Sequence, residues 1–244
     1  NNSPLQINFT DFNIATLTGF VESDSLLVNG LLNGSAMVKN LQSQPTFTTD
    51  LTVENLSIYQ DTIGNLRAKI DNSIANSYHA AITLNDRQNN VSINGDYNVN
   101  PVNSSYDFMV NIEALQMKSL EGFTKGGIKN ARGFLHGKIA LNGTLQNPNI
   151  DGRINFDNTA FNVSAVNNLF KIDEASIAII NNKGIELSNF VIRDTANNAL
   201  SIEGAINTTD FYNYNFDLAI KARNFQAINS TNKDNKLFYG KIVF

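Results

Sequence analysis

The sequence predicts an all-β protein organised as an elongated antiparallel sheet, and three observations lead to this prediction. Apolar and polar residues alternate along most of the chain, which is typical of strands with one buried face. Short polar clusters rich in Asn, Asp and Gly separate the alternating runs, as turns do. Landmarks also recur at an interval of 103 residues, which indicates a repeated structural unit.

The repeat divides the chain into parts of one continuous β array. The landmarks that share the 103-residue interval are Gly34, Gly137 and Gly240, then Pro45 and Pro148, then the tetrapeptides that begin at Leu17 and Leu120. We therefore expect residues 1–29 to end a preceding repeat, 30–132 to form a first repeat, 133–236 a second, and 237–244 to begin a third. Because both ends of the sequence fall inside a repeat, we expect it to be part of a longer array.

The clearest strand signal is the run Tyr106-Phe108-Val110-Ile112, which the second repeat restates as Tyr214-Phe216-Leu218-Ile220. Elsewhere the alternation breaks, as between Leu51-Val53 and Leu56-Ile58. We therefore expect many short strands, below the roughly 9–11 residues of a membrane-spanning strand. Helix is expected only as a turn or two within residues 114–129, where glycines interrupt the pattern, and as a short turn at residues 164–169.

Composition excludes several classes of function. The net charge is −4 and the isoelectric point is near 5.2, so the chain lacks the basic surface that nucleic-acid binding requires. Cysteine is absent, which excludes disulfides and thiol catalysis but leaves the compartment open. Polarity comes largely from about 40 asparagines, which favour turns over helices. No apolar run reaches the roughly 18 residues of a membrane helix.

Candidate chemical sites are few, and each has a simpler structural interpretation. His79 and His136 are the only histidines; His79 is expected to face outward on a strand, and no metal site is predicted. The segment Asp86–Asp96 resembles an acidic calcium loop only faintly, and its counterpart Asp194–Gly204 favours a repeated hairpin turn instead. Neither paired carboxylates nor a nucleophile beside a base is evident, so we expect no cofactor and no enzymatic activity.

The apolar face of the strands is therefore the candidate functional surface. In a β-sandwich two such faces close on each other, whereas a repeated sheet can curl so that its apolar face lines an open trough that lengthens with each repeat. Alternation does not separate these two arrangements. The residues expected to line the trough are Leu51, Val53, Phe108, Val110, Ile112, Ile139, Leu141, Ile154, Phe156, Phe216, Leu218 and Ile220.

The order and spacing of several motifs resemble the TamB-type members of the AsmA-like superfamily, in the form found in Bacteroidetes. The pattern G-x-L-x-G-x-[IL]-x-[LV]-x-G-x-x-x-x-P covers Gly133–Pro148 and, more loosely, Gly30–Pro45. Further matching segments are Gly184–Asp194, Asn198–Gly204, Phe211–Phe225 and Asn235–Lys241. The resemblance implies a twisted sheet folded into a taco-like trough with an apolar interior, and it carries no catalytic residues.

The resemblance also implies a function. Members are anchored in the inner membrane, cross the periplasm, and take part in lipid movement and, with an Omp85-type outer-membrane partner, in envelope assembly. We therefore expect a non-enzymatic periplasmic segment that holds phospholipid acyl chains and meets its protein partner through regions outside this chain. The alternatives are a closed β module that pairs with other chains by strand addition and a piece of a membrane barrel.

Overall fold

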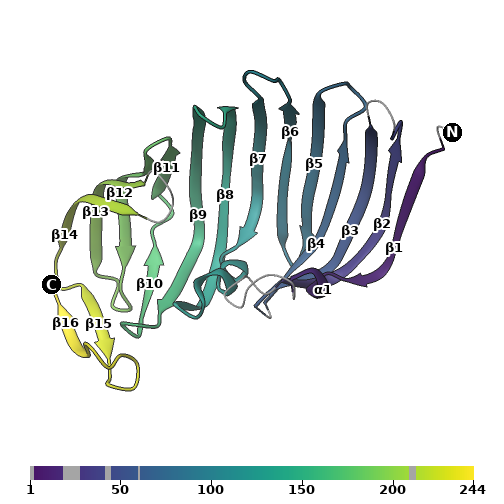
Figure 1. Cartoon of the computed structure of the whole chain (residues 1–244). Helices are drawn as coiled ribbons and strands as arrows, with labels where there is room; N and C mark the ends of the chain where they lie inside the picture. The colour runs from purple at the N-terminus through teal and green to yellow at the C-terminus, as the bar shows by residue number, and fades with distance from the viewer. Residues whose placement is uncertain (1–2, 19–27, 42–44, 60, 209–212) are drawn as a thin grey trace. The chain divides into compact units, whose positions relative to one another are not determined.

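The computed structural model describes residues 3–18, 28–41, 45–59, 61–208 and 213–244 and is all-β (Figure 1). Parts of two sequence motifs, Gly19-Phe20 and Phe211-Tyr212, lie outside these residues. The strands are β1 (Leu5–Asn13), β2 (Val28–Lys39), β3 (Thr46–Ile58), β4 (Asp61–Asp71), β5 (Ser77–Asp86), β6 (Asn89–Asn98), β7 (Ser105–Gln116), β8 (Ile128–Thr144), β9 (Pro148–Val163), β10 (Asn168–Ile172), β11 (Ile177–Asn181), β12 (Gly184–Arg193), β13 (Ala199–Thr208), β14 (Tyr214–Ala222), β15 (Gln226–Ser230) and β16 (Gly240–Val243).

Fourteen strands form one sheet, and the order of strands in it is almost the order in the sequence. From β1 to β10 each strand neighbours the next, and β12, β13 and β14 complete the order. The short strand β11 pairs with both β9 and β12, while β15 and β16 form a separate two-stranded sheet. The sheet begins at β1 and ends at β14 without closing on itself. The predicted long antiparallel sheet is thus confirmed.

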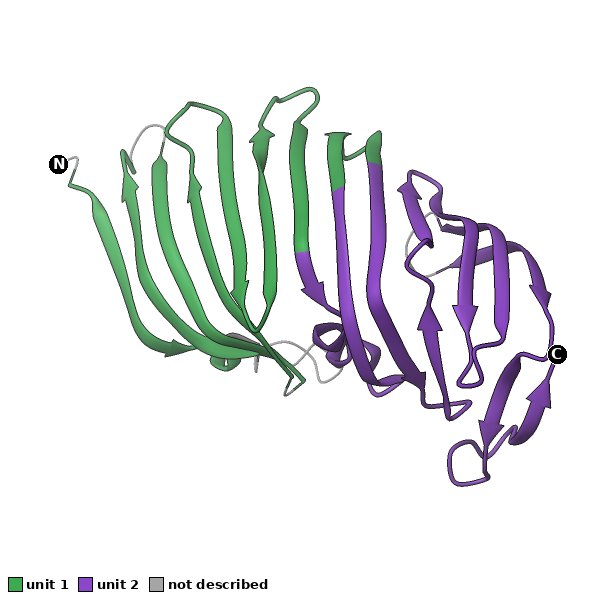
Figure 2. Cartoon of the chain, turned by 180° about the vertical axis from the view of Figure 1, so that it is seen from behind, with its two compact units in different colours: residues 1–113, 139–150 green, residues 114–138, 151–244 purple. Residues whose placement is uncertain are grey.

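The chain divides into two compact units, which we describe separately (Figure 2). Unit 1 contains residues 1–113 and 139–150, and unit 2 contains residues 114–138 and 151–244. The expected shortage of helix is confirmed, because helix is confined to α1 (Ala15–Thr18), η1 (Met117–Leu120) and η2 (Gly122–Thr124) in the described residues. The last two are single 3₁₀ turns inside the segment for which only a turn or two was expected.

The expectation of short strands is wrong, and in β3 a β-bulge is the reason. Strand β3 has 13 residues and β8 has 17. The register of β3 shifts between Val53 and Leu56, where Asn55 adopts the left-handed conformation at φ 51°. A bulge inserts one residue without ending the strand, so the apolar spacing changes from two to three while both side chains stay on one face. The broken alternation is therefore a bulge and not a strand end.

The bulges also explain part of the asparagine content. Equivalent register shifts occur in β1, around Asp11, and in β12, around Asn189. Asn and Asp tolerate the left-handed region better than other residues with a Cβ. In two bulges the backbone N–H that leaves the ladder donates to an Asn side chain on the next strand: Asp11 to Asn33 Oδ1 at 2.7 Å and Asn55 to Asn65 Oδ1 at 2.9 Å.

Each unit has its own small buried cluster. In unit 1 the buried residues Val53, Leu56, Ile58 and Ile63 lie toward one end of the strands, and Ile14, Val28, Leu32, Tyr59, Leu66 and Leu84 pack against them. In unit 2 the buried residues are Ile172, Leu187 and Phe190, and the residues around them include Phe156, Phe161, Ile202 and Leu218. Most other apolar residues of the sheet are only half-buried.

Candidate functional site: an uncovered apolar face

The strand register gives unit 1 one apolar face and one polar face. Ile82 on β5 lies between Ala68 on β4 and Ile93 on β6. Two residues further along β5, Leu84 lies between Leu66 and Val91 in the same way. Since side chains two apart on a strand share a face, these cross-strand rows form one continuous apolar surface. Most of its residues are half-buried, and on β1 Leu5 and Ile7 are 49% and 43% exposed.

Seven of the predicted lining residues lie in unit 1. Leu51 pairs with Gly34 and Val53 pairs with Leu32, which places both on the apolar face. Phe108 lies against Gly95, where an added Cβ would come within 2.5 Å of its ring. Val110 and Ile112 follow Phe108 in alternation on β7, as Ile139 and Leu141 follow one another on β8. Only Val53 is buried, and the other six are half-buried.

The other five predicted lining residues lie in unit 2. Ile154 pairs with Ala178, and Leu218 pairs with Gly204. Phe156 meets Phe190 edge-to-face with ring centroids 5.4 Å apart, inside the buried cluster. On β14, Phe216 and Ile220 pair with Ile206 and Ile202 but remain 63% and 57% exposed. The structure therefore places these five on apolar rows, three of them on β14 at the end of the sheet.

The opposite face of unit 1 carries charged and polar residues. Asp50 accepts hydrogen bonds from Arg67 Nε and Nη2 at 3.0 and 2.7 Å, and Lys69 lies 3.6 Å away. The hydrogen bond from Arg67 is the main cause that lowers the pKa of Asp50. His79 lies on this face, with Nδ1 3.0 Å from Asp96 Oδ1, as the outward orientation predicted for it requires.

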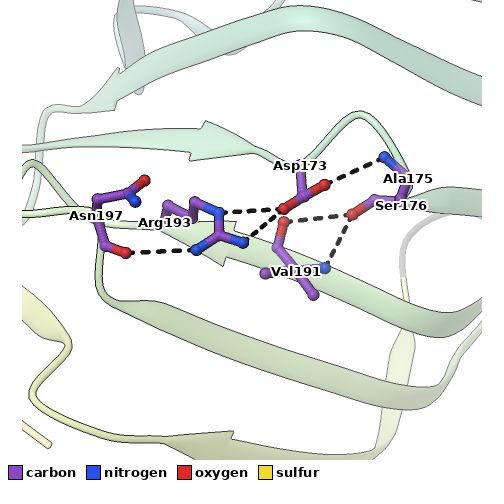
Figure 3. Close-up of polar contacts among 6 residues, drawn as sticks. All are labelled: Asp173, Ala175, Ser176, Val191, Arg193 and Asn197. Carbon is purple, nitrogen blue, oxygen red and sulfur yellow. Dashed lines mark hydrogen bonds and ion pairs between the residues drawn. The ribbon is translucent and has the colours of Figure 1, made fainter.

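A group of Asp, Ser and Arg in unit 2 is structural rather than catalytic (Figure 3). The hydroxyl of Ser176 donates to the carbonyl oxygen of Val191 at 3.3 Å and accepts from its N–H at 2.9 Å, which reproduces a step of the β-ladder. Asp173 accepts from Arg193 Nε and Nη2 at 3.1 and 2.8 Å, and the hydrogen bond from Arg193 is the main cause that lowers its pKa. Ser176 is fully buried, so its hydroxyl cannot reach a substrate.

Asp194 is the residue whose importance the sequence did not reveal. Its repeat counterpart, Asp86, is exposed at a hairpin turn, but Asp194 is fully buried. Its carboxylate accepts from the N–H groups of Ala196 and Asn198 at 2.9 Å each and from that of Gln226 at 2.8 Å. Burial raises the pKa of Asp194, but these hydrogen bonds together outweigh it and the net shift is downward. The contact with Gln226 ties β15 to the β12–β13 turn.

Three further observations bear on cofactors and membranes. Within the described ranges no group of three His, Cys, Asp or Glu residues is placed to hold a metal ion. A depression of about 600 Å³ at the ends of β12, β13 and β14 is lined mostly by Asn side chains. In the part of the chain that the structure describes, no helix has the length and apolar character needed to span a membrane.

A long antiparallel sheet that does not close into a barrel, with an apolar and a polar face in unit 1, defines an extended all-β protein. Comparison with protein families agrees with this class. The model described as TamB, N-terminal domain, matches residues 2–156, more than half of the chain, and the protein belongs to the TamB family. Comparisons with curated proteins and with solved structures find no match.

Membership of the family places the chain in a broad functional context. TamB proteins form a structural and transport family of the cell envelope rather than a family of enzymes. The chain therefore has a role in the translocation-and-assembly system to which this family belongs.

Proposed function

We propose that this chain is a non-enzymatic periplasmic segment of a bridge between the inner and outer membranes, and that its apolar face carries phospholipid acyl chains. The observation that supports the proposal most directly is the apolar face of unit 1. Its side chains are aligned across neighbouring strands, as Ala68, Ile82 and Ile93 are, yet they are only half-buried. A contiguous apolar surface of this kind marks an interaction site in a soluble protein.

The physical chemistry of the face suits an acyl chain. Burying a methylene contributes about 0.8 kcal/mol. An acyl chain lying on the face has about half of its surface covered, so each methylene contributes about half of this value. Ten methylenes then contribute about 4 kcal/mol for one acyl chain. This acyl contact is non-directional and requires no particular residue, so a lipid can slide across the sheet from one strand to the next.

The wider role in the envelope is part of the same proposal. The full-length protein is anchored in the inner membrane, crosses the periplasm, and supports outer-membrane assembly with an Omp85-type partner. That partner contacts regions outside residues 1–244. The family to which the chain belongs supports this placement.

Native mass spectrometry of the purified chain, followed by extraction and analysis of the bound lipids, tests the proposal. We expect co-purified phospholipid in the wild-type protein. The variants Phe216→Asp and Ile220→Asp should lose lipid without losing the fold, because these two side chains are 63% and 57% exposed. Val110→Asp makes the same change on the half-buried apolar face of unit 1 and should also reduce bound lipid.

Matched controls use the opposite face of the same strands. Ala219 is next to Ile220 on β14, and Met109 is next to Val110 on β7, but both point away from the apolar face. The controls are therefore Ala219→Asp for Ile220→Asp and Met109→Asp for Val110→Asp. Ala219→Asp and Met109→Asp should retain normal lipid. Wild-type protein that stays free of lipid after incubation with labelled phospholipid would contradict the proposal.

A structural module that binds other chains by strand addition is the second candidate. The observation in its favour is that β14 ends the strand order of the sheet while Tyr214, Phe216 and Ile220 remain exposed. An edge strand of this kind can accept a further strand through its backbone. A lipid-free protein that self-associates, and that Pro substitutions in β14 return to monomer, would favour this candidate.

A further inference from the structure

The apolar face of unit 1 has two chemically different margins. The aromatic margin consists of Phe47, Tyr78, Tyr97 and Tyr106, and the aliphatic margin consists of Val53, Leu56, Ile58 and Ile63. The two margins lie toward opposite ends of the strands, and the aliphatic one coincides with the buried cluster of the unit. A face that changes chemistry along the strand direction can orient a ligand whose two ends differ.

The aromatic margin is a row of rings on neighbouring strands. Tyr78 pairs with Tyr97, with ring centroids 6.3 Å apart, and the ring of Phe47 lies 5.7 Å from that of Tyr78. Because Phe108 lies against Gly95, Tyr106 lies beside Tyr97 in the same row. No hydrogen bond among the described residues engages the three phenol hydroxyls.

The connections beyond the rings carry several polar residues together with two exposed apolar ones, Ile74 and Val102, which are 72% and 94% exposed. The connection from β4 to β5 carries Asn72, Ser73 and Asn76, and the connection from β6 to β7 carries Asn100 and Ser104, whose backbone and side chains bond to each other. A tyrosine has an apolar ring and a polar tip and favours the boundary between hydrocarbon and water. The row therefore marks the water side of the face.

Toward the other margin the face becomes mainly aliphatic. Thr49 has a hydroxyl group on this face, but the hydroxyl already bonds to the backbone of Ile70. It donates to the carbonyl oxygen at 3.2 Å and accepts from the N–H at 3.0 Å. Beyond it the side chains are aliphatic, and the row ends among Leu56, Ile58 and Ile63, each less than 9% exposed. Two polar side chains lie near this end: Asn89, which is buried and donates to the carbonyl oxygen of Ile63, and Tyr59, which packs against the cluster. The end is therefore mainly aliphatic, in contrast to the three phenol groups of the aromatic margin.

The distance between the margins matches one leaflet of a bilayer. Tyr78 and Leu84 are six residues apart on β5, which corresponds to about 20 Å at 3.3–3.4 Å per residue. One leaflet is about 15 Å thick in its hydrocarbon part and about 20 Å thick with its polar headgroup region, and a belt of Tyr marks the interface of membrane proteins in the same way.

From this geometry, and on the basis of the proposed function, we propose that a bound phospholipid lies across unit 1 in one orientation. Its headgroup and ester region lie at the aromatic margin, and its acyl chains run along the strands toward the aliphatic margin. The Tyr hydroxyls donate hydrogen bonds to the phosphate and ester oxygens. The aromatic margin is then the open edge at which lipid enters and leaves.

Single-tryptophan fluorescence tests the orientation, because the chain contains no Trp. Tyr78→Trp and Leu84→Trp place a probe near each margin on the same face of β5, and Thr83→Trp places a control on the polar face. Ile93→Trp is a second probe of the apolar interior in case Leu84→Trp disturbs the cluster. Each is measured with phosphatidylcholine that carries a nitroxide on its headgroup and, separately, with phosphatidylcholine brominated near the acyl ends.

The headgroup nitroxide should quench Tyr78→Trp more strongly than Leu84→Trp or Ile93→Trp, and the brominated lipid should show the reverse order. Thr83→Trp should be quenched by neither lipid. If mass spectrometry of the same samples detects bound lipid but the two quenchers give equal or inverted ratios, the orientation is wrong and the proposed function stands. If no lipid is bound, the proposed function fails and the orientation fails with it.

Discussion

The two units have the same alternation of apolar and polar residues but bury their apolar side chains in different ways. In unit 1 the strands follow each other in simple antiparallel order, and the buried residues gather at one end of the face. In unit 2 the chain inserts the short strands β10 and β11 between β9 and β12, and β15 packs nearby, with Phe225 stacked on Phe170. Local chain connections, more than composition, decide which part of an apolar face is covered.

The polar contacts also differ between the units, because those of unit 1 are exposed and that of Asp194 in unit 2 is buried. Asp50, Arg67 and Lys69 of unit 1 form an exposed network that contributes little to stability. Asp194 of unit 2 is buried and holds three backbone N–H groups, one of them from β15. We infer that unit 2 depends on a few specific contacts, whereas unit 1 depends on the ladder of its sheet.

The largest expected effect is that of Phe225→Ala. Phe225 is 2% exposed and stacks on Phe170 at 5.7 Å and 10°, so its truncation should destabilise the protein by about 3–5 kcal/mol. Phe47→Ala, in the half-buried face of unit 1, should cost less than half as much. Urea unfolding followed by circular dichroism measures both, and equal losses would remove the contrast between the units.

Gly34→Ala should have the next largest effect and tests the ladder of unit 1. Gly34 has φ +123°, and an added Cβ would lie 2.1 Å from the carbonyl oxygen of Asp50. Backbone strain and the clash together should cost about 3 kcal/mol.

Gly240→Ala is the matched control for this clash. Gly240 has φ +132° but no atom within 4 Å of an added Cβ. Only the strain remains, at about 1–2 kcal/mol. Thermal unfolding compares the two variants, and a loss at Gly240 as large as that at Gly34 would show that strain alone determines the effect.

Asp194→Ala should destabilise unit 2 by about 2 kcal/mol, because it leaves buried N–H groups without an acceptor. Asp86→Ala, at the corresponding exposed turn of unit 1, should cost less, because no buried N–H group loses its acceptor there. Hydrogen exchange should show faster exchange at Gln226 in Asp194→Ala and no change near Asp86→Ala. Unchanged protection at Gln226 would mean that β15 docks without this carboxylate.

The smallest expected effect is a pH dependence of unit 2. The folded-state pKa values of Asp173 and Asp194 lie below the ordinary value of 3.8, so each carboxylate contributes stability that is fully present above that value. The contribution is lost as the pH falls through the folded-state pKa values. The melting temperature should therefore fall less steeply below about pH 4 in Asp194→Ala than in wild type, and parallel curves would contradict the assignment.

The sequence predicted the fold class, the antiparallel order and the faces of most strands, because a period of two specifies sidedness directly. It did not predict the lengths of β1, β3 and β12, since a bulge at Asp11, Asn55 or Asn189 looks like a strand end when only alternation is counted. It also missed the burial of Asp194, whose partner Gln226 lies 32 residues away. The residues that line the face remain predictions until lipid is measured.

The bulges have a consequence for how the chain finds its native pairing. A strand that paired one residue out of step would place a left-handed residue against a regular ladder and turn its apolar side chains to the wrong face. The bulges therefore disfavour any pairing of neighbouring strands that is shifted by one residue. They do not specify the pairing partner of a strand over the whole chain, because Asn55 and Asn158 both adopt left-handed conformations at the 103-residue interval of the sequence landmarks.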